Sequence, residues 1–498
     1  MQNSISTKLI INHSKSKFKK KMKYIATFIN NNNFHNFCVT EFLSVCQIYG
    51  IKNVKYNEET FGYDIRKEPY IEISFDDIEN SELCQKLVER AALLKTIIKV
   101  YGEGENMDEL ILDIQKNSSE EFKKEIDSYD SFRFDMDFRG LSEDRKTEIA
   151  MIDKFDVFPM NANVDIKNAK RIFIIFRNVV EDQKSNKILG TKYFFGRQIA
   201  GKDNNKFRFY SKYDLVHRKY IGPTSTDHIL SFLMTNFAQV KENQLVIDPF
   251  VGTGSLLIPP SIYKAICFGC DLDVRVLKGY SVGYTRKEDG DREKRKADIF
   301  SNFDVYELER PQIIMQDINK SGFKKNNFLF DCIICDPPYG WRAGVRKTGL
   351  SDIKKEKREK RLDLRRKEIK KNKEEDDKNK KNNENAINDE DDDDWENHQE
   401  EKDFNYCHLN GEKRLFLPTS QSTVNNIFDG LVEFAINNLK KDGFLVCLYP
   451  VKKEKGEEEL ANRPINFPRP SQFKLISVCE NVNSRLRSRW CIIYKKIT

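Results

Sequence analysis

The residues with the clearest chemical potential follow a short apolar run. Residues 330–335 have no helical period and predict a buried parallel strand. They are followed by Asp336, Pro337, Pro338 and Tyr339, and the prolines cannot continue a strand because they lack backbone N–H groups. The Asp336 carboxylate and the Pro337 carbonyl can each accept one hydrogen of a planar amine, while the Tyr339 ring stacks on it. The pattern indicates a site for an aromatic amine, although a plain proline turn that closes a strand fits the same residues.

A second motif lies upstream, from Leu245 to Ser255. A short apolar strand ends at Asp248, and Gly252 and Gly254 allow a tight turn that can approach a ligand closely. The turn lacks the third glycine of a dinucleotide-binding loop and is weak evidence by itself. A carboxylate at Asp248 suits the cationic ammonium of S-adenosylmethionine and would repel a pyrophosphate, which argues against NAD.

Two further predicted strands end near acids. The run from Ala265 to Leu272 contains Asp271, which is placed to accept both ribose hydroxyls of a nucleoside cofactor. The run from Gln312 to Met315 precedes Asp317, which can bond an adenine amine. Ligands of open α/β sheets bind at the carboxyl ends of the strands, so these acids predict one ligand site.

Together these segments resemble a known family. DPFVGTGS and DPPYG, with RKYIGPTSTD (residues 218–227) and FGRQIA (residues 195–200) upstream, resemble the tRNA guanine-N2 methyltransferases. The similarity is strongest to the eukaryotic catalytic subunits that modify guanine 10, and it extends from about Met22 to the C-terminus apart from one insertion. DPPY alone is shared by amino methyltransferases that act on DNA, rRNA and protein glutamine. Thr226 stands where the family usually has methionine, a departure not expected to affect the chemistry.

The resemblance implies a fold and a reaction. The expected fold is α/β, a Rossmann-like class I methyltransferase with a seven-stranded, mostly parallel sheet, preceded by an α+β region that contains a THUMP RNA-binding domain. The expected reaction is methyl transfer from S-adenosylmethionine to the exocyclic N2 of a tRNA guanine. The predicted catalytic residues are Asp336, Pro337 and Tyr339. The predicted cofactor-binding residues are Thr224, Asp248, Phe250, Gly252, Gly254, Ser255, Asp271, Asp317 and Asp336.

The resemblance also implies partners. These are tRNA and a small zinc-binding activator subunit that covers an apolar edge of the methyltransferase sheet. The basic loop after DPPYG offers Arg342, Arg346 and Lys347 as phosphate contacts, and Arg197 lies in an aromatic and basic segment that suits RNA. Alternatives are an amino methyltransferase that acts on another RNA position or on DNA adenine N6, and a non-catalytic RNA-binding scaffold. The intact motif residues argue against the scaffold.

Composition sets broader limits. The chain has 498 residues, of which 33% are charged, and a net charge of +7, which weakly favours a polyanionic partner. No apolar run reaches transmembrane length. The eleven cysteines lie mostly in strand-like runs and indicate reduced thiols in a cytoplasmic protein. Two CxxC spacings, Cys267/Cys270 and Cys332/Cys335, do not predict a metal site, because residues three apart in a strand point to opposite faces.

The sequence predicts the following organisation. Residues 1–21 form a disordered basic leader, and 22–190 an α+β region with the THUMP domain. A connector spans 191–220, where aromatic and basic side chains indicate either RNA contacts or a packed linker. Residues 221–498 form the methyltransferase domain, interrupted at 351–404 by a charged segment with almost no apolar residues, which we expect to be disordered or a solvated helix.

Local patterns predict further elements. An amphipathic helix is expected from Glu79 to Val100. Leu256 to Ile258 is expected to form a short helix that Pro259 and Pro260 end. Near the C-terminus, a helix is expected over 422–439, followed by a strand over 444–451 and an antiparallel pair of strands on either side of 483–489.

Overall fold

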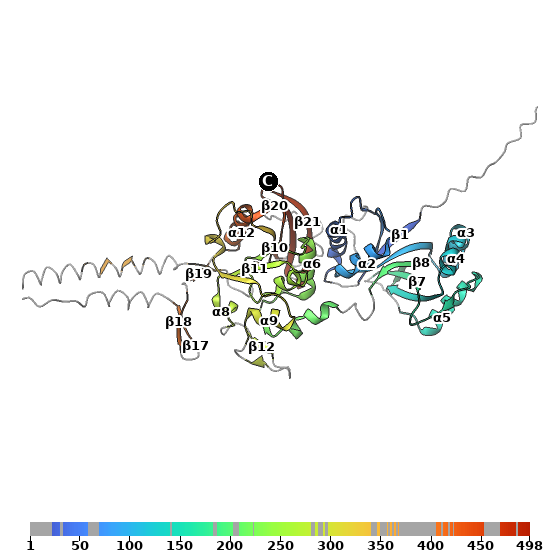
Figure 1. The fold of residues 1–498 in the computed structure, drawn as a ribbon, viewed down its shortest axis with the longest axis horizontal. Coiled ribbons are helices and arrows are strands. Elements are labelled where there is room, and N and C mark those ends of the chain that lie inside the picture. The colour runs from blue at the N-terminus through green and yellow to red at the C-terminus, as the bar shows by residue number, and fades with distance from the viewer. Residues whose placement is uncertain are drawn as a thin grey trace, which may run out of the picture. The chain divides into compact units, whose positions relative to one another are not determined.

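The fold is given by a computed structural model (Figure 1). It describes residues 22–29, 33–57, 69–139, 142–182, 187–202, 209–222, 224–279, 284–286, 292–293, 297–339, 346–348, 405–409, 412–416, 419–421, 423–452, 469–484 and 487–498, with isolated positions between 356 and 367. The expected leader (1–21) and nearly all of the expected insertion (351–404) lie outside these residues. No helix of the described ranges has the length and apolar character needed to cross a membrane.

The chain divides into two units, each described here by itself. The N-terminal unit is drawn from residues 1–29, 53–85 and 95–201, and the C-terminal unit from residues 30–52, 86–94 and 202–498. The division does not follow the chain in simple order, because two early segments belong to the C-terminal unit.

The N-terminal unit is built on an eight-stranded sheet with the order β2-β3-β1-β4-β8-β7-β5-β6. β5 runs parallel to β6 and β7, whereas β8 is antiparallel to β4 and β7. On α4, Phe122 packs edge-on to Phe173 and Phe195, with ring centroids 5.4 and 5.1 Å apart. The strands are β1 Lys23–Phe28, β2 Lys55–Tyr56, β3 Tyr70–Ser74, β4 Leu94–Gly104, β5 Ser131–Arg139, β6 Asn163–Val164, β7 Arg171–Asp182 and β8 Lys187–Gly201; the helices are α3 Met107–Asn117, α4 Ser119–Asp127 and α5 Arg145–Asp153.

The predicted helix over residues 79–100 is wrong in its second half. α2 covers only Ser81–Arg90, and β4 begins at Leu94. After the helix the chain is rich in β-branched residues (Thr96, Ile97, Ile98, Val100), which favour a strand. β4 lies inside the sheet between β1 and β8 and is buried along most of its length, so its apolar run reflects two covered faces rather than a helical stripe.

The expected connector, residues 191–220, begins inside this sheet, because its first residues belong to β8. Phe194 and Phe195 are fully buried there. Further along, Tyr210 and Arg218 are also buried, at 7% and 2% exposure. Of the two interpretations of this stretch, the packed linker fits these side chains.

The C-terminal unit contains the predicted seven-stranded sheet, with the order β14-β11-β10-β15-β20-β22-β21. The first five strands are parallel to their neighbours, and β22 is antiparallel to both β20 and β21. This is the expected Rossmann-like class I methyltransferase fold. The strands are β10 Leu245–Asp248, β11 Ile266–Asp271, β14 Gln312–Met315, β15 Phe330–Cys335, β20 Leu439–Lys452, β21 Phe473–Ser484 and β22 Arg487–Lys496. The predicted parallel strands and the antiparallel pair are confirmed.

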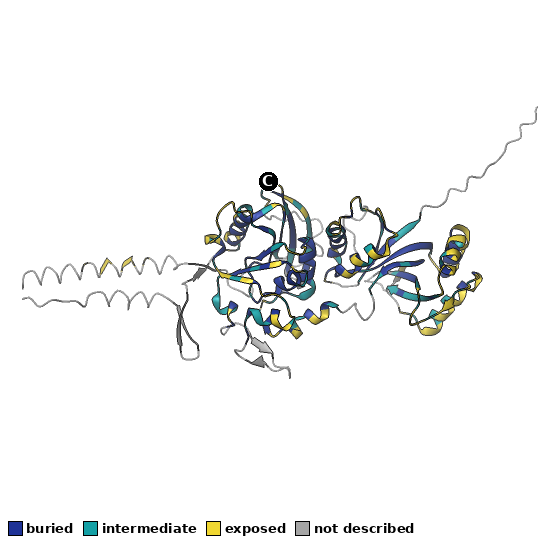
Figure 2. Ribbon diagram, in the orientation of Figure 1, coloured by how far each residue is buried: buried dark blue, intermediate teal, exposed yellow. Residues whose placement is uncertain are grey.

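Helices cover this sheet, and buried residues concentrate along its strands (Figure 2). α12 buries Ile427, Leu431 and Phe434, part of the apolar stripe that predicted it, in a core shared with β15, β20 and β22. The helices of this unit are α1 Cys38–Ile48, α6 His228–Phe237, α7 Ile258–Ile262, α8 Val274–Leu277, α9 Ile299–Val305 and α12 Val424–Asn438; the shorter strands are β9 Tyr220–Ile221, β12 Tyr284–Arg286, β13 Arg292–Glu293, β16 Arg346–Thr348, β17 Asn405–Leu409, β18 Glu412–Phe416 and β19 Thr419–Gln421.

Pro259 and Pro260 do not end a helix, contrary to the prediction. They lie in the first turn of α7, which follows a 3-10 turn at Ser255–Leu257. The first N–H groups of a helix have no acceptor within it, so prolines are tolerated there and their fixed φ favours the helical backbone.

A buried carboxylate ties the two early segments to the C-terminal unit. Glu41 of α1 is fully buried and accepts hydrogen bonds from the N–H groups of Ala92 and Leu93, at 2.6 and 2.8 Å. Its Oε1 also accepts a bond from Asn236 Nδ2 at 2.8 Å, and Asn236 Oδ1 accepts one from Arg90 Nε at 2.8 Å. Burial raises the pKa of Glu41 while these donors oppose the rise. The unit that carries the seven-stranded sheet therefore includes residues well before position 221.

The four CxxC cysteines lie where the strand pattern placed them. Cys267 and Cys270 are in β11, and Cys332 and Cys335 are in β15. All four are buried and reduced. Burial raises the pKa of each thiol, so these side chains behave as small core residues.

Candidate active site

The predicted acids gather at one edge of the seven-stranded sheet. β10 ends at Asp248, β11 ends at Asp271, and Asp336 follows the last residue of β15. These strands are parallel neighbours, so their carboxyl ends meet at the same edge. Asp317 follows β14, the strand beside β11, and reaches the same edge. These four acids thus lie at the carboxyl ends of neighbouring parallel strands, and their role as one ligand site stays a prediction.

The glycine turn wraps around Asp271. Gly252 and Gly254 have φ values of 51° and 84°, a backbone conformation that favours glycine. The N–H of Gly252 donates to Asp271 Oδ2 at 3.0 Å, and the N–H of Asp273 donates to Oδ1 at 2.8 Å. Burial raises the pKa of Asp271 to about 6, although these two donors oppose the rise. The carboxylate is thus held in place by backbone groups on both oxygens.

Asp248 is the most enclosed acid of the group, with 1% of its surface exposed. The N–H of Phe250 donates to its Oδ1 at 2.9 Å. Burial raises its pKa well above the usual range, and the neighbouring Asp271 and Asp336 carboxylates raise it further. Within the described part of the chain Asp248 forms no ion pair, so a cationic ligand would stabilise its charged form.

Side chains behind the glycine turn hold it in position. Ser225 Oγ and Thr253 Oγ1 are hydrogen-bonded at 2.8 Å, which links the PTSTD segment to the turn. The buried Arg218 donates to Ser255 Oγ at 2.5 Å. Among the predicted cofactor-binding residues, Ser255 is therefore engaged with the protein, Phe250 is half-buried and Thr224 is exposed.

Asp317 is 5% exposed and opens a 3-10 turn at Ile318–Lys320. Its Oδ1 accepts from the N–H of Asn319 at 3.0 Å. The preceding Gln316 donates its N–H to the backbone oxygen of Asp271 at 3.1 Å. Asp317 thus lies beside the Asp271 turn, as the proposed adenine contact requires.

Asp336 has partners that the sequence did not indicate. Arg489 Nη1 of β22 donates to Asp336 Oδ2 at 3.0 Å, and the hydroxyl of Thr226 donates to the same oxygen at 3.4 Å. The hydroxyl of Tyr339 donates to Oδ1. Arg489 Nη2 also donates to Asn481 Oδ1 at 3.0 Å. Burial raises the pKa of Asp336, and Arg489, Tyr339 and Thr226 each oppose that rise.

Two of these partners were not assigned to the site from the sequence. Arg489 is one of three arginines, with Arg485 and Arg487, near the connection between the last two strands, and its guanidinium lies at the acid edge of the sheet. Thr226, the departure from the family pattern, is 6% exposed and hydrogen-bonded to the predicted catalytic acid. Nothing in the local sequence separates Arg489 from its neighbouring arginines, because its role depends on the order of the strands.

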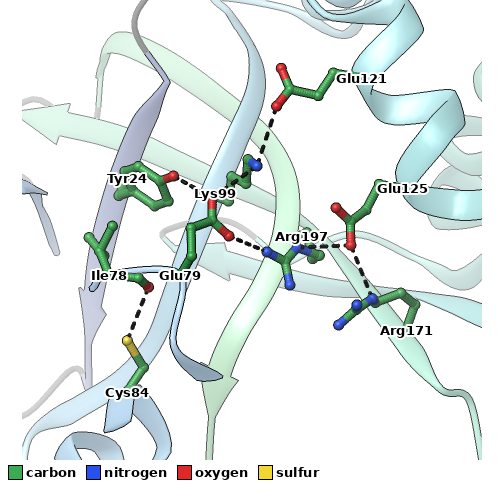
Figure 3. Close-up of polar contacts among 9 residues, drawn as sticks. All are labelled: Tyr24, Ile78, Glu79, Cys84, Lys99, Glu121, Glu125, Arg171 and Arg197. Atoms are coloured by element: carbon green, nitrogen blue, oxygen red, sulfur yellow. Dashed lines mark hydrogen bonds and ion pairs between the residues drawn. The ribbon is translucent and has the colours of Figure 1, made fainter. Parts of the chain in front are cut away.

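The predicted RNA-contacting residues differ in their structural surroundings. Arg197 of β8 is 6% exposed and pairs with Glu79 and Glu125 at 2.5 and 3.2 Å (Figure 3). Its side chain is occupied by these acids, so we do not keep Arg197 among the proposed RNA contacts. Arg346 and Lys347 lie in β16, which pairs with β19. Arg342 lies outside the described residues.

Comparison with known proteins agrees with this geometry. Residues 22–204 match the family model of the Tmrp11 THUMP N-terminal domain. The chain is 29% identical over 295 residues to tRNA (guanine(10)-N(2))-methyltransferase TRMT11 of Mus musculus, covering 59% of this chain and 61% of the relative. It is 28% identical over 349 residues to the Dictyostelium discoideum enzyme of the same name (67% and 65% covered) and 27% identical over 423 residues to that of Xenopus laevis (84% and 75% covered). The resemblance inferred from the motifs is confirmed, and the aligned region spans about three fifths of the first of these relatives.

Proposed function

We propose that this chain transfers a methyl group from S-adenosylmethionine to the exocyclic N2 of a guanine in tRNA, at position 10 as in the relatives named above. The main support is one arrangement at the sheet edge: the Asp336-Pro337-Pro338-Tyr339 loop ends β15 beside Asp248 at the end of β10, and the next strand, β11, ends at Asp271. A nucleoside cofactor and a planar amine would thus meet at adjacent strand ends.

The acids of this edge fit the cofactor. When bound, S-adenosylmethionine supplies a methyl group on a sulfonium that leaves as a neutral thioether. Asp248 is buried without an ion-pair partner among the described residues and would bind the methionyl ammonium. Asp271 would accept the ribose hydroxyls, and Asp317 the adenine amine. Three carboxylates at one edge would disfavour a pyrophosphate, which supports this cofactor over NAD.

The DPPY loop supports an amine acceptor role. The lone pair of a guanine N2 amine is delocalised into the ring, so the nitrogen is a weak nucleophile. Acceptance of its two hydrogens by Asp336 and the Pro337 carbonyl would favour a pyramidal nitrogen and direct its lone pair to the methyl group. Asp336 or water would then take the proton. Tyr339 would stack on the base once it has left its own stack.

We further propose that the region matching the Tmrp11 THUMP model binds tRNA, and that Arg342, Arg346 and Lys347 contact its phosphates near the target base. A tRNA substrate and the absence of a long apolar run are consistent with activity in the cytoplasm.

Product analysis tests the function directly. We expect tRNA from cells that lack this chain to lose N2-methylguanosine at one position, and the purified chain to restore it with S-adenosylmethionine. Nucleoside mass spectrometry of digested tRNA measures both. Formation of N6-methyladenine in place of N2-methylguanosine would instead indicate an amino methyltransferase that acts on adenine. The absence of any methylated product would indicate a non-catalytic RNA-binding scaffold.

We also propose the activator subunit as a partner. β14 is an edge strand of the seven-stranded sheet, and its Ile314 and Met315 are 38% and 43% exposed. An exposed apolar edge strand is a liability that a partner can cover. Ile314→Lys with Met315→Lys is expected to abolish copurification with the activator and leave S-adenosylmethionine binding within about twofold. Full activity of the chain alone, unchanged when the activator is added, would contradict this proposal.

A further inference from the structure

Asp336 is supported by a residue that lies 153 positions away in the chain. Arg489 sits in β22, two strands from β15, and its side chain crosses β20 to reach the carboxylate at 3.0 Å. Its pairing partner on the neighbouring strand β21 is Asn481, which is 4% exposed and accepts a hydrogen bond from Arg489 Nη2 at 3.0 Å. The guanidinium is therefore held from behind by an almost completely buried amide while it bonds the acid in front.

The two oxygens of Asp336 have different surroundings. Oδ2 accepts from Arg489 and Thr226, which belong to a strand and to the segment just before α6. Oδ1 accepts from the hydroxyl of Tyr339, three residues further on the same loop. A target amine that donates to Oδ1 would share this oxygen with the Tyr339 hydroxyl or replace it. Oδ2 would stay bonded to the rigid frame of the sheet.

Several neighbouring groups influence whether the Asp336 carboxyl is ionised. Asp336 interacts electrostatically with the following groups: Arg489 of β22, Asp248 at the end of β10, Tyr339 of its own loop, and the thiols of Cys335 and Cys491. Burial disfavours the ionised carboxylate, and Asp248 is a like charge nearby. Arg489 is the cation of this group, and it favours the carboxylate form that accepts an amine hydrogen.

We propose that Arg489 is a positioning residue for Asp336: anchored by Asn481, it holds Oδ2 of the carboxylate so that Oδ1 faces the target amine. This inference rests on the proposed function and adds a residue that acts through Asp336 rather than on the substrate. It also explains why an arginine, with two separate terminal donor nitrogens, occupies the position, since Nη2 reaches Asn481 and Nη1 reaches Asp336.

Three variants of the full chain, copurified with the activator if the chain alone is inactive, separate charge from geometry. Arg489→Met removes the positive charge and the hydrogen bonds to Asp336 and Asn481. Arg489→Lys keeps a charge but cannot reach Asn481 and Asp336 at once. Asn481→Ala keeps the arginine charge and removes the amide that holds the guanidinium. The matched control is Lys440→Met, which breaks the 2.8 Å ion pair of Lys440 with Asp331 near the opposite end of β15. Methylation rates are measured from pH 5 to 9, with melting temperatures and S-adenosylmethionine affinities for each variant.

In Arg489→Met we expect the acidic limb of the pH–rate profile to move upward by about one pH unit or more, because the favourable charge is lost. At neutral pH its kcat should fall at least about tenfold. Arg489→Lys and Asn481→Ala should keep the wild-type limb and lose kcat alone. Lys440→Met should match the wild type, and S-adenosylmethionine affinity should stay within about twofold in every variant.

The inference would be overturned if the acidic limb of the pH–rate profile does not move in Arg489→Met and if Arg489→Lys and Asn481→Ala both keep the wild-type kcat. That result would leave the proposed function intact. A mere loss of stability would lower activity equally at all pH values and would also count against it. If Arg489→Met does not fold, unchanged kcat in both Arg489→Lys and Asn481→Ala suffices to reject the positioning role. A wild-type chain that makes no N2-methylguanosine would instead reject the proposed function and this inference with it.

Discussion

Replacing Asp336 by alanine is expected to lower methylation of tRNA by at least about a hundredfold, the usual scale for loss of a positioned proton acceptor. The substitution removes the charged acceptor at the end of β15 and leaves the glycine turn and Asp271 in place. S-adenosylmethionine affinity should change little, and tRNA affinity, which depends mostly on phosphate contacts, should stay close to wild type. Single-turnover rates and both dissociation constants are the required measurements.

Two further variants make this test specific. Asp336→Asn should be less severe than alanine, because the amide oxygen still accepts one bond. Asp331→Ala is the control, since Asp331 lies on the same strand near its opposite end and pairs with Lys440. In Asp336→Ala the half-buried Arg489 loses its carboxylate, which should cost on the order of 1–3 kcal/mol of stability, so melting temperatures must accompany the rates. Near wild-type methylation by a folded Asp336→Ala protein would remove Asp336 from the catalytic set.

Replacing Asp271 by alanine should act on the cofactor instead of on the chemical step. The carboxylate would accept two ribose hydroxyls, and two hydrogen bonds to a charged group are worth about 1.5–3 kcal/mol each, so the dissociation constant of S-adenosylmethionine should rise at least about a hundredfold. At saturating cofactor, kcat should recover most of its wild-type value. Isothermal titration calorimetry and kinetics at several cofactor concentrations separate the two effects.

The control for Asp271 is Asp273→Ala. It removes a carboxylate of the same turn that pairs with Arg275 at 2.6 Å, and it leaves the backbone N–H that donates to Asp271. Its cofactor affinity should remain within a few-fold of wild type. Equal losses of affinity in the Asp271 and Asp273 variants would mean that the turn, and not the Asp271 carboxylate, carries the effect.

The raised pKa of Asp271 adds a pH signature to the same experiment. With a pKa of about 6, the carboxyl is protonated in more acidic solution and cannot accept both ribose hydroxyls. A ligand that needs the ionised form competes with the proton, so affinity should rise with pH up to about 6 and level off above it. Asp271→Asn should lose this component of the rise. Without ligand the linkage has the opposite sign: the folded pKa exceeds the ordinary value of 3.8, so this group makes the free energy of unfolding fall as pH rises between those two values.

Much of the candidate site was predictable from the sequence because it is local. Each of the strands β10, β11 and β15 is a short apolar run, and each is ended by an acid or by an acid with prolines. Buried parallel strands need apolar residues on both faces, and the carboxyl ends of neighbouring strands share an edge. Local pattern therefore predicted Asp248, Asp271 and Asp336 at one edge, together with the glycine turn between the first two.

Local sequence pattern was not sufficient where secondary structure depended on the strands that flank a segment, or where a side chain pairs with residues far away in the sequence. Residues 94–100 have an apolar spacing that suits a helix, but they form β4 because strands flank it on both sides. Local pattern also did not show that Arg197, predicted as an RNA contact, lies buried between Glu79 and Glu125 (Figure 3).

Arg489 is the clearest case of a role that the sequence could not reveal. The antiparallel insertion of β22 between β20 and β21 brings it to Asp336 and places Asn481 behind it. The sequence determined which residues can accept an amine or hold a cofactor, since that follows from side-chain chemistry and strand ends. Only the tertiary structure decided which cation supports the central acid, because an ion pair between residues 153 apart exists only when the strand order brings them together.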